Sequence, residues 1–241
     1  MEPRNYRHWV ERRDLVPFTV TVKETDLWLL AATDLTRQTY RLVRKYRRML
    51  EEHIARQPDF LTSLAPVTVP DDAPPIVIEM AAAGREAHVG PMAAIAGAIA
   101  ESVGRELLAF TPQIIVENGG DIFLKTTRKR KAGIYAGASP LTGKIGLEIA
   151  AADTPLGICT SSGTVGPSLS FGKADAVITL AASAALADAA ATAIGNRITD
   201  AADFDAGIQF AQGIRGLRGV VIIKGKKLAA WGKVKLCETQ S

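Results

Sequence analysis

The sequence contains few of the residues that would build a disulfide framework or a zinc site. Cys159 and Cys237 are its two cysteines, and they do not form a Cys-x-x-Cys pair. The three histidines show neither a His-Glu-x-x-His pattern nor another paired ligand spacing. These shortages argue against a disulfide-stapled secreted domain and against zinc. For Cys159, a buried structural thiol is the favoured interpretation over a nucleophile, because no histidine lies near it in the sequence.

Long apolar runs are also missing. The longest, near residues 176–187, is too short to cross a bilayer and ends at Asp188. The first fourteen residues, MEPRNYRHWVERRD, lack the apolar centre of a secretory signal. We therefore expect a soluble, cytoplasmic protein with reduced thiols and no membrane partner.

The net charge of +4 is mild, but the positive residues gather in two segments. These are RLVRKYRRML (41–50) and TTRKRK (126–131). Such segments are usually a solvated helix face and an exposed loop, although either could meet a polyanion. A nucleic-acid partner is disfavoured, because no aromatic residues interleave the run as single-strand binders favour. An interaction protein that uses the basic helix 41–56 to bind nucleic acid or an acidic partner stays open as an alternative.

Hydrophobic patterning predicts an α+β protein in which antiparallel β-hairpins or a sheet pack against helices. Ser183 is placed to cap a helix that continues through Ile198. The expected strands are 17–22, 26–32, 75–80, two strands within 113–126 around Gly119-Gly120, 132–137, 144–151 and 175–182. The expected helices are 34–56, 87–110 and 184–198, with connectors at 57–75 and 159–177 and a closing hairpin at 218–234.

We expect one domain over residues 1–241. It would consist of an N-terminal hairpin and basic helix (17–57), a ligand-binding core (88–200) and the closing hairpin (218–234). The predicted helix 87–110 is largely alanine and glycine, so another element or a ligand should approach its backbone closely. Alanine-rich helices of this kind are compatible with packing inside one subunit or across a homodimer.

A polar stripe runs along the predicted alanine-rich helix. Asp188, Thr192 and Asn196 are spaced i, i+4 and i+8, which places them on one face. A carboxylate and a hydroxyl one turn apart are hard oxygen ligands that suit Mg²⁺. The alternative interpretation is a polar face that is only hydrogen-bonded or solvated.

Two glycine-containing segments are candidates for ligand contact. In VENGGDIF (116–123), Asn118 and Asp121 flank two glycines; these residues make hairpin turns, but bare backbone there would also cradle a phosphate. The segment CTSSGTVGPSLSFGKADAV (159–177) is rich in hydroxyls that would bind phosphate or ribityl oxygens, or else cap backbone groups in a loop. His88, beside a glycine turn, is either an acid–base group or a helix-entry residue.

These segments, in this order, resemble the ApbE superfamily of magnesium-dependent flavin transferases, which move FMN from FAD onto a protein threonine. The similarity rests on AIAGAIAESVGRELL (94–108) followed by VENGGDI, on CTSSGT (159–164), and on AVITLAASAALADAAATAIGN (176–196). The combination of GPMAAIAGAIAE, VENGGDIF, CTSSGTVG and SFGKADAV is more similar still to an uncharacterised branch of that superfamily. On that comparison the resemblance spans nearly the whole chain.

The resemblance implies an ApbE-like fold that binds FAD, FMN or a related small phosphorylated ligand with Mg²⁺. It implies metal ligands at Asp188 and Thr192, and makes Asp188, Asp121 and His88 the catalytic candidates. The implied cofactor contacts are Glu101, Asn118, Gly119, Gly120, Thr160, Ser161 and Gly163.

Two departures from the flavin transferases bear on the reaction. Ala96 stands where they have a lysine, and VGPSLSFGKAD (165–175) replaces a longer segment that contains a histidine. The loss of a base puts transfer to a threonine hydroxyl in doubt. The sequence therefore leaves open a transferase or hydrolase acting at the phosphate, and a non-catalytic flavin- or nucleotide-binding module.

Overall fold

The computed structural model describes residues 14–163 and 171–239. The strands are β1 (Val16–Val22), β2 (Thr25–Ala31), β3 (Ile114–Asn118), β4 (Asp121–Lys125), β5 (Arg130–Gly133), β6 (Ile145–Ile149), β7 (Leu156–Ser161), β8 (Ala176–Ala181), β9 (Leu217–Lys224), β10 (Lys227–Gly232) and β11 (Leu236–Glu238). The helices are α1 (Thr36–Arg56), α2 (Asp59–Thr62), α3 (Pro75–Ala87), α4 (Ile95–Leu107), α5 (Ala184–Gly195) and α6 (Phe204–Gly213), with short 3₁₀ helices η2 (Pro91–Ala94), η3 (Ala151–Asp153) and η4 (Ala201–Asp203).

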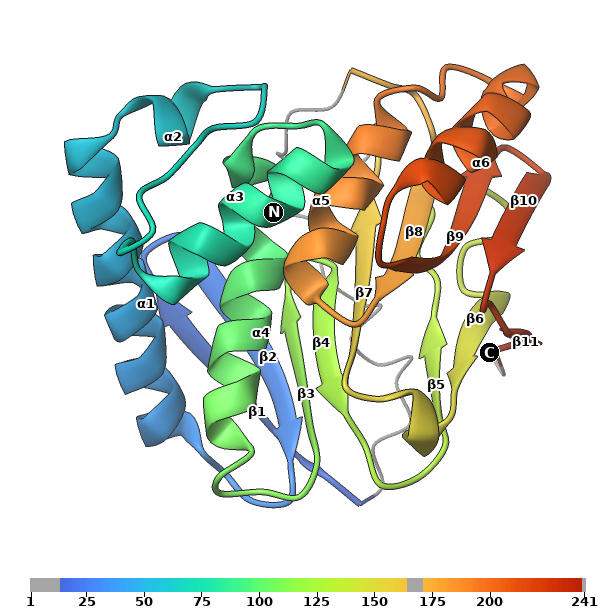
Figure 1. Ribbon diagram of the computed structural model, residues 1–241. Coiled ribbons are helices and arrows are strands. Elements are labelled where there is room, and N and C mark those ends of the chain that lie inside the picture. The colour runs from blue at the N-terminus through green and yellow to red at the C-terminus, as the bar shows by residue number, and fades with distance from the viewer. Residues whose placement is uncertain (1–13, 164–170, 240–241) are drawn as a thin grey trace.

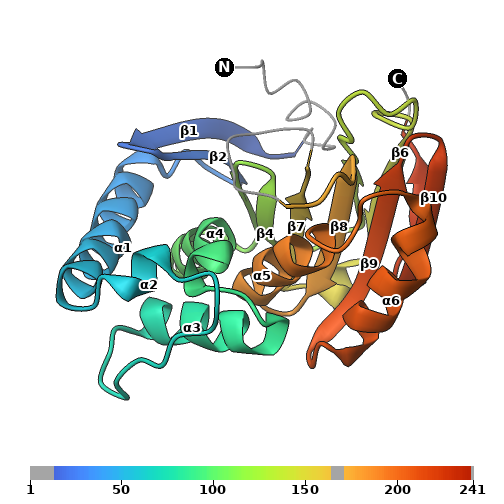
Figure 2. The ribbon, with the colours of Figure 1, turned by 90° about the horizontal axis from the view of Figure 1, so that it is seen from above.

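The strands form two antiparallel sheets (Figure 1). The large sheet has the order β1-β2-β3-β4-β7-β8-β9-β10, and the small sheet has the order β11-β6-β5. The helices α3, α4 and α5 lie side by side over one face of the large sheet, with α1 beside β1 and α6 beside β9 and β10 (Figure 2). The predicted α+β class and its antiparallel sheets are confirmed.

Both faces of the central strands of the large sheet are buried. Leu29, Val116 and Phe123 point into the core under the helices. Their chain neighbours Leu30, Ile115 and Leu124 point into a second core shared with the small sheet. A strand covered on both faces has no polar side, so these strands read as continuous apolar runs rather than as strict alternation. The helices within residues 14–163 and 171–239 are each too short or too polar to span a bilayer.

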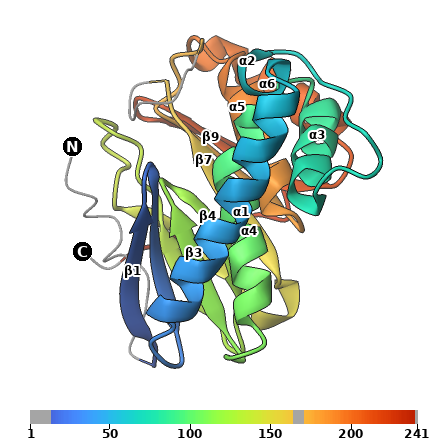
Figure 3. The same cartoon turned by 90° about the vertical axis from the view of Figure 1, so that its left-hand side faces the viewer.

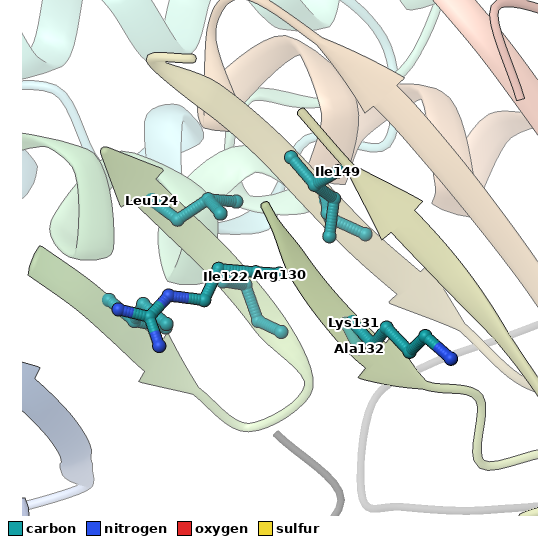
Figure 4. A pocket seen from close by; sticks show the side chains of 8 residues that line it. Ile122, Leu124, Arg130, Lys131, Ala132 and Ile149 are labelled. Carbon is teal, nitrogen blue, oxygen red and sulfur yellow. The ribbon is translucent and has the colours of Figure 1, made fainter. Parts of the chain in front are cut away.

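A small cavity lies between the two sheets (Figure 4). Its volume is about 10 Å³, and its lining is mostly isoleucine and leucine. The side chains of Arg130 and Lys131 extend from it in opposite directions, as expected of strand neighbours. A space of this size holds at most one water, so this cavity does not serve as a ligand site.

The structure agrees with the sequence over the hairpins and two of the helices. The predicted strands 17–22 and 26–32 pair as β1 and β2, and the segment 113–126 forms β3 and β4. Ser183 caps α5, since its Oγ accepts a hydrogen bond from the backbone N of Leu186 at 3.3 Å. The closing hairpin 218–234 corresponds to β9 and β10.

The prediction of a strand at 75–80 was wrong, because these residues begin helix α3. Ile76, Val77 and Met80 are buried, and their spacing covers one face of a helix. A short apolar run does not by itself distinguish a helix from a strand. The preceding pair Pro74-Pro75 gives the deciding local signal, since proline is favoured in the first turn of a helix.

The predicted helix 87–110 begins too early. Helix α3 ends at Ala87, His88 adopts a left-handed backbone conformation with φ 58°, and α4 starts at Ile95 after η2. The predicted connector 159–177 likewise begins too early, since Cys159, Thr160 and Ser161 belong to β7. Helix α6 and strand β11 were not predicted, because both are short and α6 carries two glycines.

Helix α4 contacts α5 through glycine. A Cβ on Gly97 would lie 2.2 Å from the carbonyl oxygen of Ala184, and a Cβ on Gly157 of β7 would lie 2.4 Å from the Cα of Ala184. The element that approaches the backbone of the alanine- and glycine-rich helix is therefore α5 of the same chain.

Gly97→Ala should lower the free energy of unfolding by about 1–3 kcal/mol, because its methyl group would overlap a backbone oxygen that cannot rotate away. Urea denaturation followed by circular dichroism measures this change. The control is Gly213→Ala at the end of α6, where an added Cβ meets nothing within 4 Å. A stability loss of the same size in both variants would contradict the packing argument.

Candidate functional site

Asp188, in the middle of α5, faces the first turn of α4. Its Oδ2 accepts a hydrogen bond from the backbone N of Gly97 at 2.9 Å, and the amide of Ala96 also interacts with the carboxylate. The first amides of a helix have no partner within the helix and carry a partial positive charge. The carboxylate of Asp188 therefore ties the middle of α5 to the start of α4.

The turn between β3 and β4 is attached to the same turn of α4. The Nδ2 of Asn118 donates a hydrogen bond to the carbonyl oxygen of Ala96 at 3.1 Å. Gly119 and Gly120 have φ values of 69° and 108°, a region that favours glycine. The backbone N of Gly120 donates to the Oε1 of Glu117 at 2.8 Å, so this amide already has an anionic partner.

Asp121 begins β4 and is only 7% exposed. Its Oδ1 accepts a hydrogen bond from the backbone N of Thr160 in β7 at 3.2 Å. The thiol of Cys159 interacts with the carboxylates of both Asp121 and Asp188, and its Sγ donates to the carbonyl oxygen of Ala184 at 3.3 Å. The predicted burial of Cys159 is confirmed.

The electrostatics of this cluster favour protonated acids. Burial raises the pKa of Asp121 to about 7, even though hydrogen bonds from Cys159 and from the amide of Thr160 lower it. Burial, and next the charge of Asp121, raise the pKa of Asp188 well above its usual range against the amides of Gly97 and Ala96. Burial and the same two carboxylates raise the pKa of the Cys159 thiol, so it is no thiolate nucleophile.

Three hydroxyls of the site are available to a ligand. Thr192 lies one turn after Asp188, and Thr160 and Ser161 end β7. Within the described ranges 14–163 and 171–239, none of these three side chains has a hydrogen-bond partner. All three are partly exposed, so their hydroxyls are free to face a bound molecule.

The third member of the polar stripe has a different role. The Oδ1 of Asn196 accepts a hydrogen bond from the backbone N of Phe171 at 2.9 Å, which fastens the chain that enters β8. The backbone N of Gly163, another predicted ligand contact, donates to the carbonyl oxygen of Ala174 at 2.9 Å and closes the base of the same connection. Thr164, Ser168 and Ser170 lie outside the described residues.

Two predicted site residues lie apart from the cluster around Asp188. The Oε2 of Glu101 accepts a hydrogen bond from the backbone N of Ala184 at 2.6 Å, so this carboxylate joins α4 to the start of α5. His88 is exposed at the end of α3, where its ring centre lies 6.3 Å from that of Phe210 on α6. Neither contacts Asp188 among the described residues.

The sequence interpretation overlooked two contributors to the site. The amides of Ala96 and Gly97 donate hydrogen bonds to Asp188. The carboxylate of Glu117 accepts a hydrogen bond from the amide of Gly120. Pro91 ahead of the alanine-rich segment was a usable signal for a helix start, and hence for free amides. No pattern in the nearby sequence predicts that Glu117 accepts a hydrogen bond from the turn that follows it.

The family described as AbpE bacteria matches residues 7–212 of this chain. The chain belongs to this family. A UPF0280 protein of Methanocella arvoryzae is 44% identical to it over 88% of this chain and 87% of the relative. A UPF0280 protein of Methanocaldococcus jannaschii is 42% identical over 94% of this chain and 92% of the relative.

Two solved structures share the fold of this AbpE family member. The ApbE protein of Thermotoga maritima superposes with a TM-score of 0.58 at 12% identity, covering 89% of this chain and 96% of that one. The apo form of the flavinyl transferase ApbE of Pseudomonas stutzeri gives a TM-score of 0.52 at 13% identity, covering 90% and 94%. The family match confirms the resemblance that we inferred from the sequence motifs. The shared fold confirms the predicted ApbE-like fold.

Asp121 should make the stability of the metal-free protein fall as the pH rises. Its pKa is about 7 in the folded protein, against about 3.9 in an unfolded chain, so between these values the folded state binds more protons. The free energy of unfolding then falls between pH 4 and 7, by up to about 1.4 kcal/mol per pH unit for this group. Asp121→Asn should flatten that dependence in urea denaturation with EDTA.

The control is Asp205→Asn, which changes an exposed carboxylate on α6 and should keep the parental pH dependence. Identical slopes for Asp121→Asn and the parent protein would refute the assignment.

Proposed function

We propose that this protein binds a flavin nucleotide, or a related phosphorylated cofactor, together with Mg²⁺ at the site around Asp188. The observation that carries this proposal is the contact of Asp188 with the first turn of α4, with Thr192 one turn further along the same face of α5. The chain's fold is shared with a protein described as a flavinyl transferase, which supports a flavin as the ligand.

The donor set suits a hydrated magnesium ion. Among the described residues, no group of three or more His, Cys, Asp or Glu side chains could hold a metal alone. Asp188 and Thr192 would therefore provide two oxygen donors, and water and phosphate oxygens would complete the coordination, as Mg²⁺ commonly requires. A bound Mg²⁺ would neutralise charge on the phosphate and stabilise charge that develops there.

The ligand would meet hydroxyls rather than free helix amides. Asp188 already accepts from the first turn of α4, and Glu117 already accepts from Gly120. The hydroxyls of Thr160 and Ser161 have no partner among the described residues and offer donors on the sheet side of the site, where β7 holds them at a fixed position.

Asp121 is the group best suited to accept a proton in a reaction at this site. Burial raises its pKa to about 7 in the metal-free protein. A cation bound at Asp188 would lower this pKa and leave Asp121 ionised, the form in which a carboxylate accepts a proton. The described histidines do not reach the site: the ring of His53 packs against Phe60 and that of His88 against Phe210. Without a histidine base, a non-catalytic flavin-binding module remains the second candidate function.

FAD should raise the midpoint of thermal unfolding only when Mg²⁺ is present. Binding to the folded state at 100 times the dissociation constant adds about 2.7 kcal/mol of stability. Asp188→Asn and Thr192→Val should each abolish the magnesium-dependent shift, because each removes one oxygen donor. Asp205→Asn is the matched control and should shift like the parent. Magnesium-dependent FAD binding that persists in Asp188→Asn would rule out the proposed metal site.

AMP formation from FAD separates an enzyme from a binding module. For an enzyme, we expect Asp121→Asn to slow AMP release by about 10²–10⁴-fold while FAD affinity stays within about twofold, since general-base catalysis contributes this much. Chromatography of the nucleotide products measures the rate. A parent protein that binds FAD with Mg²⁺ and releases no AMP above a protein-free blank is a binding module.

A further inference from the structure

Helix α1 turns a positively charged face toward the turn between β1 and β2. A cavity of about 480 Å³ lies between them, and we call it the basic groove. Its cations are Lys23 from the turn and Arg41, Arg44, Lys45, Arg47 and Arg48 from α1. Figure 3 shows α1 beside β1, at one edge of the large sheet. The volume lies within the range of pockets that bind small molecules, about 300–1,000 Å³.

The basic groove keeps an excess of positive charge. Six cations and one acid, Glu51, line it. Three acids just outside the lining pair with its cations, Glu24 with Arg47, Glu106 with Lys45 and Glu52 with Arg48, so the net charge is 6 − 4 = +2. The other basic segment, 126–131, is largely neutralised: Arg130 forms two contacts of 2.7 Å with Asp14, and Lys129 lies 3.1 Å from Glu148. Among the described residues, the unpaired positive charge of the basic groove is that of Arg41 and Arg44.

Two arginines of the basic groove have no acidic partner within residues 14–163 and 171–239. Lys23 and Arg47 both contact Glu51, at 2.9 and 3.2 Å, and Lys45 lies 2.6 Å from Glu106. Arg41 and Arg44 are exposed and form no ion pair anywhere in the described part of the chain. Their guanidinium groups are available to an external anion.

Other groups in the basic groove are held in place. The side chain of Arg47 is only 16% exposed, and its guanidinium donates to Thr25 Oγ1 at 2.8 Å and to Glu24 Oε2 at 2.5 Å. Its Nε is buried without a hydrogen-bond partner among the described residues. The guanidinium of Arg44 lies 5.8 Å from the centre of the Tyr40 ring. Donors fixed in advance lose little conformational entropy when a ligand binds.

The arrangement weakens the free protein. Arg41, Arg44 and Arg48 follow one another at spacings of three and four residues, and like charges at these spacings destabilise a helix. Acids offset part of this repulsion, since Glu51 and Glu52 lie one turn after Arg47 and Arg48. A bound anion would remove the repulsion that remains between Arg41 and Arg44.

We propose that the basic groove is a second binding site, which takes a small oligophosphate anion. Arginine supplies four of its six cations, and the planar guanidinium matches the oxygens of a phosphate better than a lysine does. A groove of about 480 Å³ has room for a compact anion with several phosphates. The ligand class is thus a small molecule with several linked phosphates.

This site is separate from the one around Asp188. The sheet order places β1 four strands from β7, which carries Thr160 and Ser161. With neighbouring strands about 4.8 Å apart, the two sites are separated by roughly 20 Å across the sheet. The proposal for the basic groove can therefore be tested without reference to the proposal for the site around Asp188, and either can be refuted alone.

Isothermal titration of the full chain with sodium tripolyphosphate tests the site, at physiological salt with EDTA and without Mg²⁺. We expect saturable binding at one site, weakened at least about tenfold in Arg41→Gln/Arg44→Gln, because charge-assisted hydrogen bonds are lost. Arg37→Gln is the matched control: Arg37 is exposed on α1 and has no ion pair with the residues that the structure describes, but it lies outside the groove. It should bind within about twofold of the parent, as should Asp188→Asn.

Absence of saturable binding, or equal weakening in Arg37→Gln, would overturn the proposal, because general charge attraction would then suffice. Urea denaturation without anion provides a second readout. Arg41→Gln/Arg44→Gln should be at least as stable as the parent, since it relieves repulsion. A clear loss of stability in that variant would instead assign these arginines a structural role.

A competition experiment distinguishes a small anion from an anionic macromolecule as the ligand. A 20-nucleotide single-stranded RNA and an octaglutamate peptide are each added to the complex with tripolyphosphate, and the affinity of each competitor is measured. Tripolyphosphate remaining the tightest ligand supports a small oligophosphate. If RNA or the peptide binds at least about tenfold more tightly through Arg41 and Arg44, the groove serves a macromolecule and the small-anion assignment is wrong.

Discussion

The close contact between α4 and α5 is the constraint on which the candidate site depends. Without a Cβ at Gly97, the backbone of Ala184 can approach α4, and this approach brings Asp188 within hydrogen-bond distance of the Gly97 amide. One turn further along α4, the carboxylate of Glu101 reaches the amide of Ala184. The same alanine packs on Gly157 of β7, so two helices and the sheet are fixed relative to one another at one residue.

This packing decides the electrostatics of the site. An anion at a helix start gains up to about 2 kcal/mol in favourable geometries, whereas withdrawing a carboxylate from water costs several kcal/mol. Burial therefore outweighs the amides of α4, and the pKa of Asp188 is raised rather than lowered. Asp121, Cys159 and Asp188 share one small volume, so each negative charge there makes the next more costly. A divalent cation would relieve this cost for both carboxylates.

The sequence predicted what depends on local periodicity. The hairpins, the long helix α1 and the cap at Ser183 follow from patterns within a few residues, and the spacing of Asp188 and Thr192 placed them on one helical face. The segment Ile76–Ile78 was misassigned because three β-branched residues in a row suit a buried strand equally well. The family assignment came from the order of whole motifs, which holds more information than any single period.

The sequence could not predict which residues from distant parts of the chain contact one another. Nothing near Asp121 indicates that a thiol of β7 and a carboxylate of α5 would lie beside it, and nothing near Asn196 indicates that it would fasten Phe171. The partner of Glu101 could not be predicted either. The sequence around a buried carboxylate is the same whether that carboxylate binds a ligand or accepts a hydrogen bond from the first amide of another helix.

The middle and one edge of the large sheet carry opposite electrostatic imbalances. Among the described residues, the buried carboxylates beside β7 and α5 have no cation as a partner, and Arg41 and Arg44 beside β1 have no acid. Each imbalance weakens the folded state, and the apolar layers on both faces of the central strands offset the loss. A ligand of the opposite charge at either place would stabilise the fold by mass action. Because the two clusters share no side chain and lie several strands apart, their effects on stability should add.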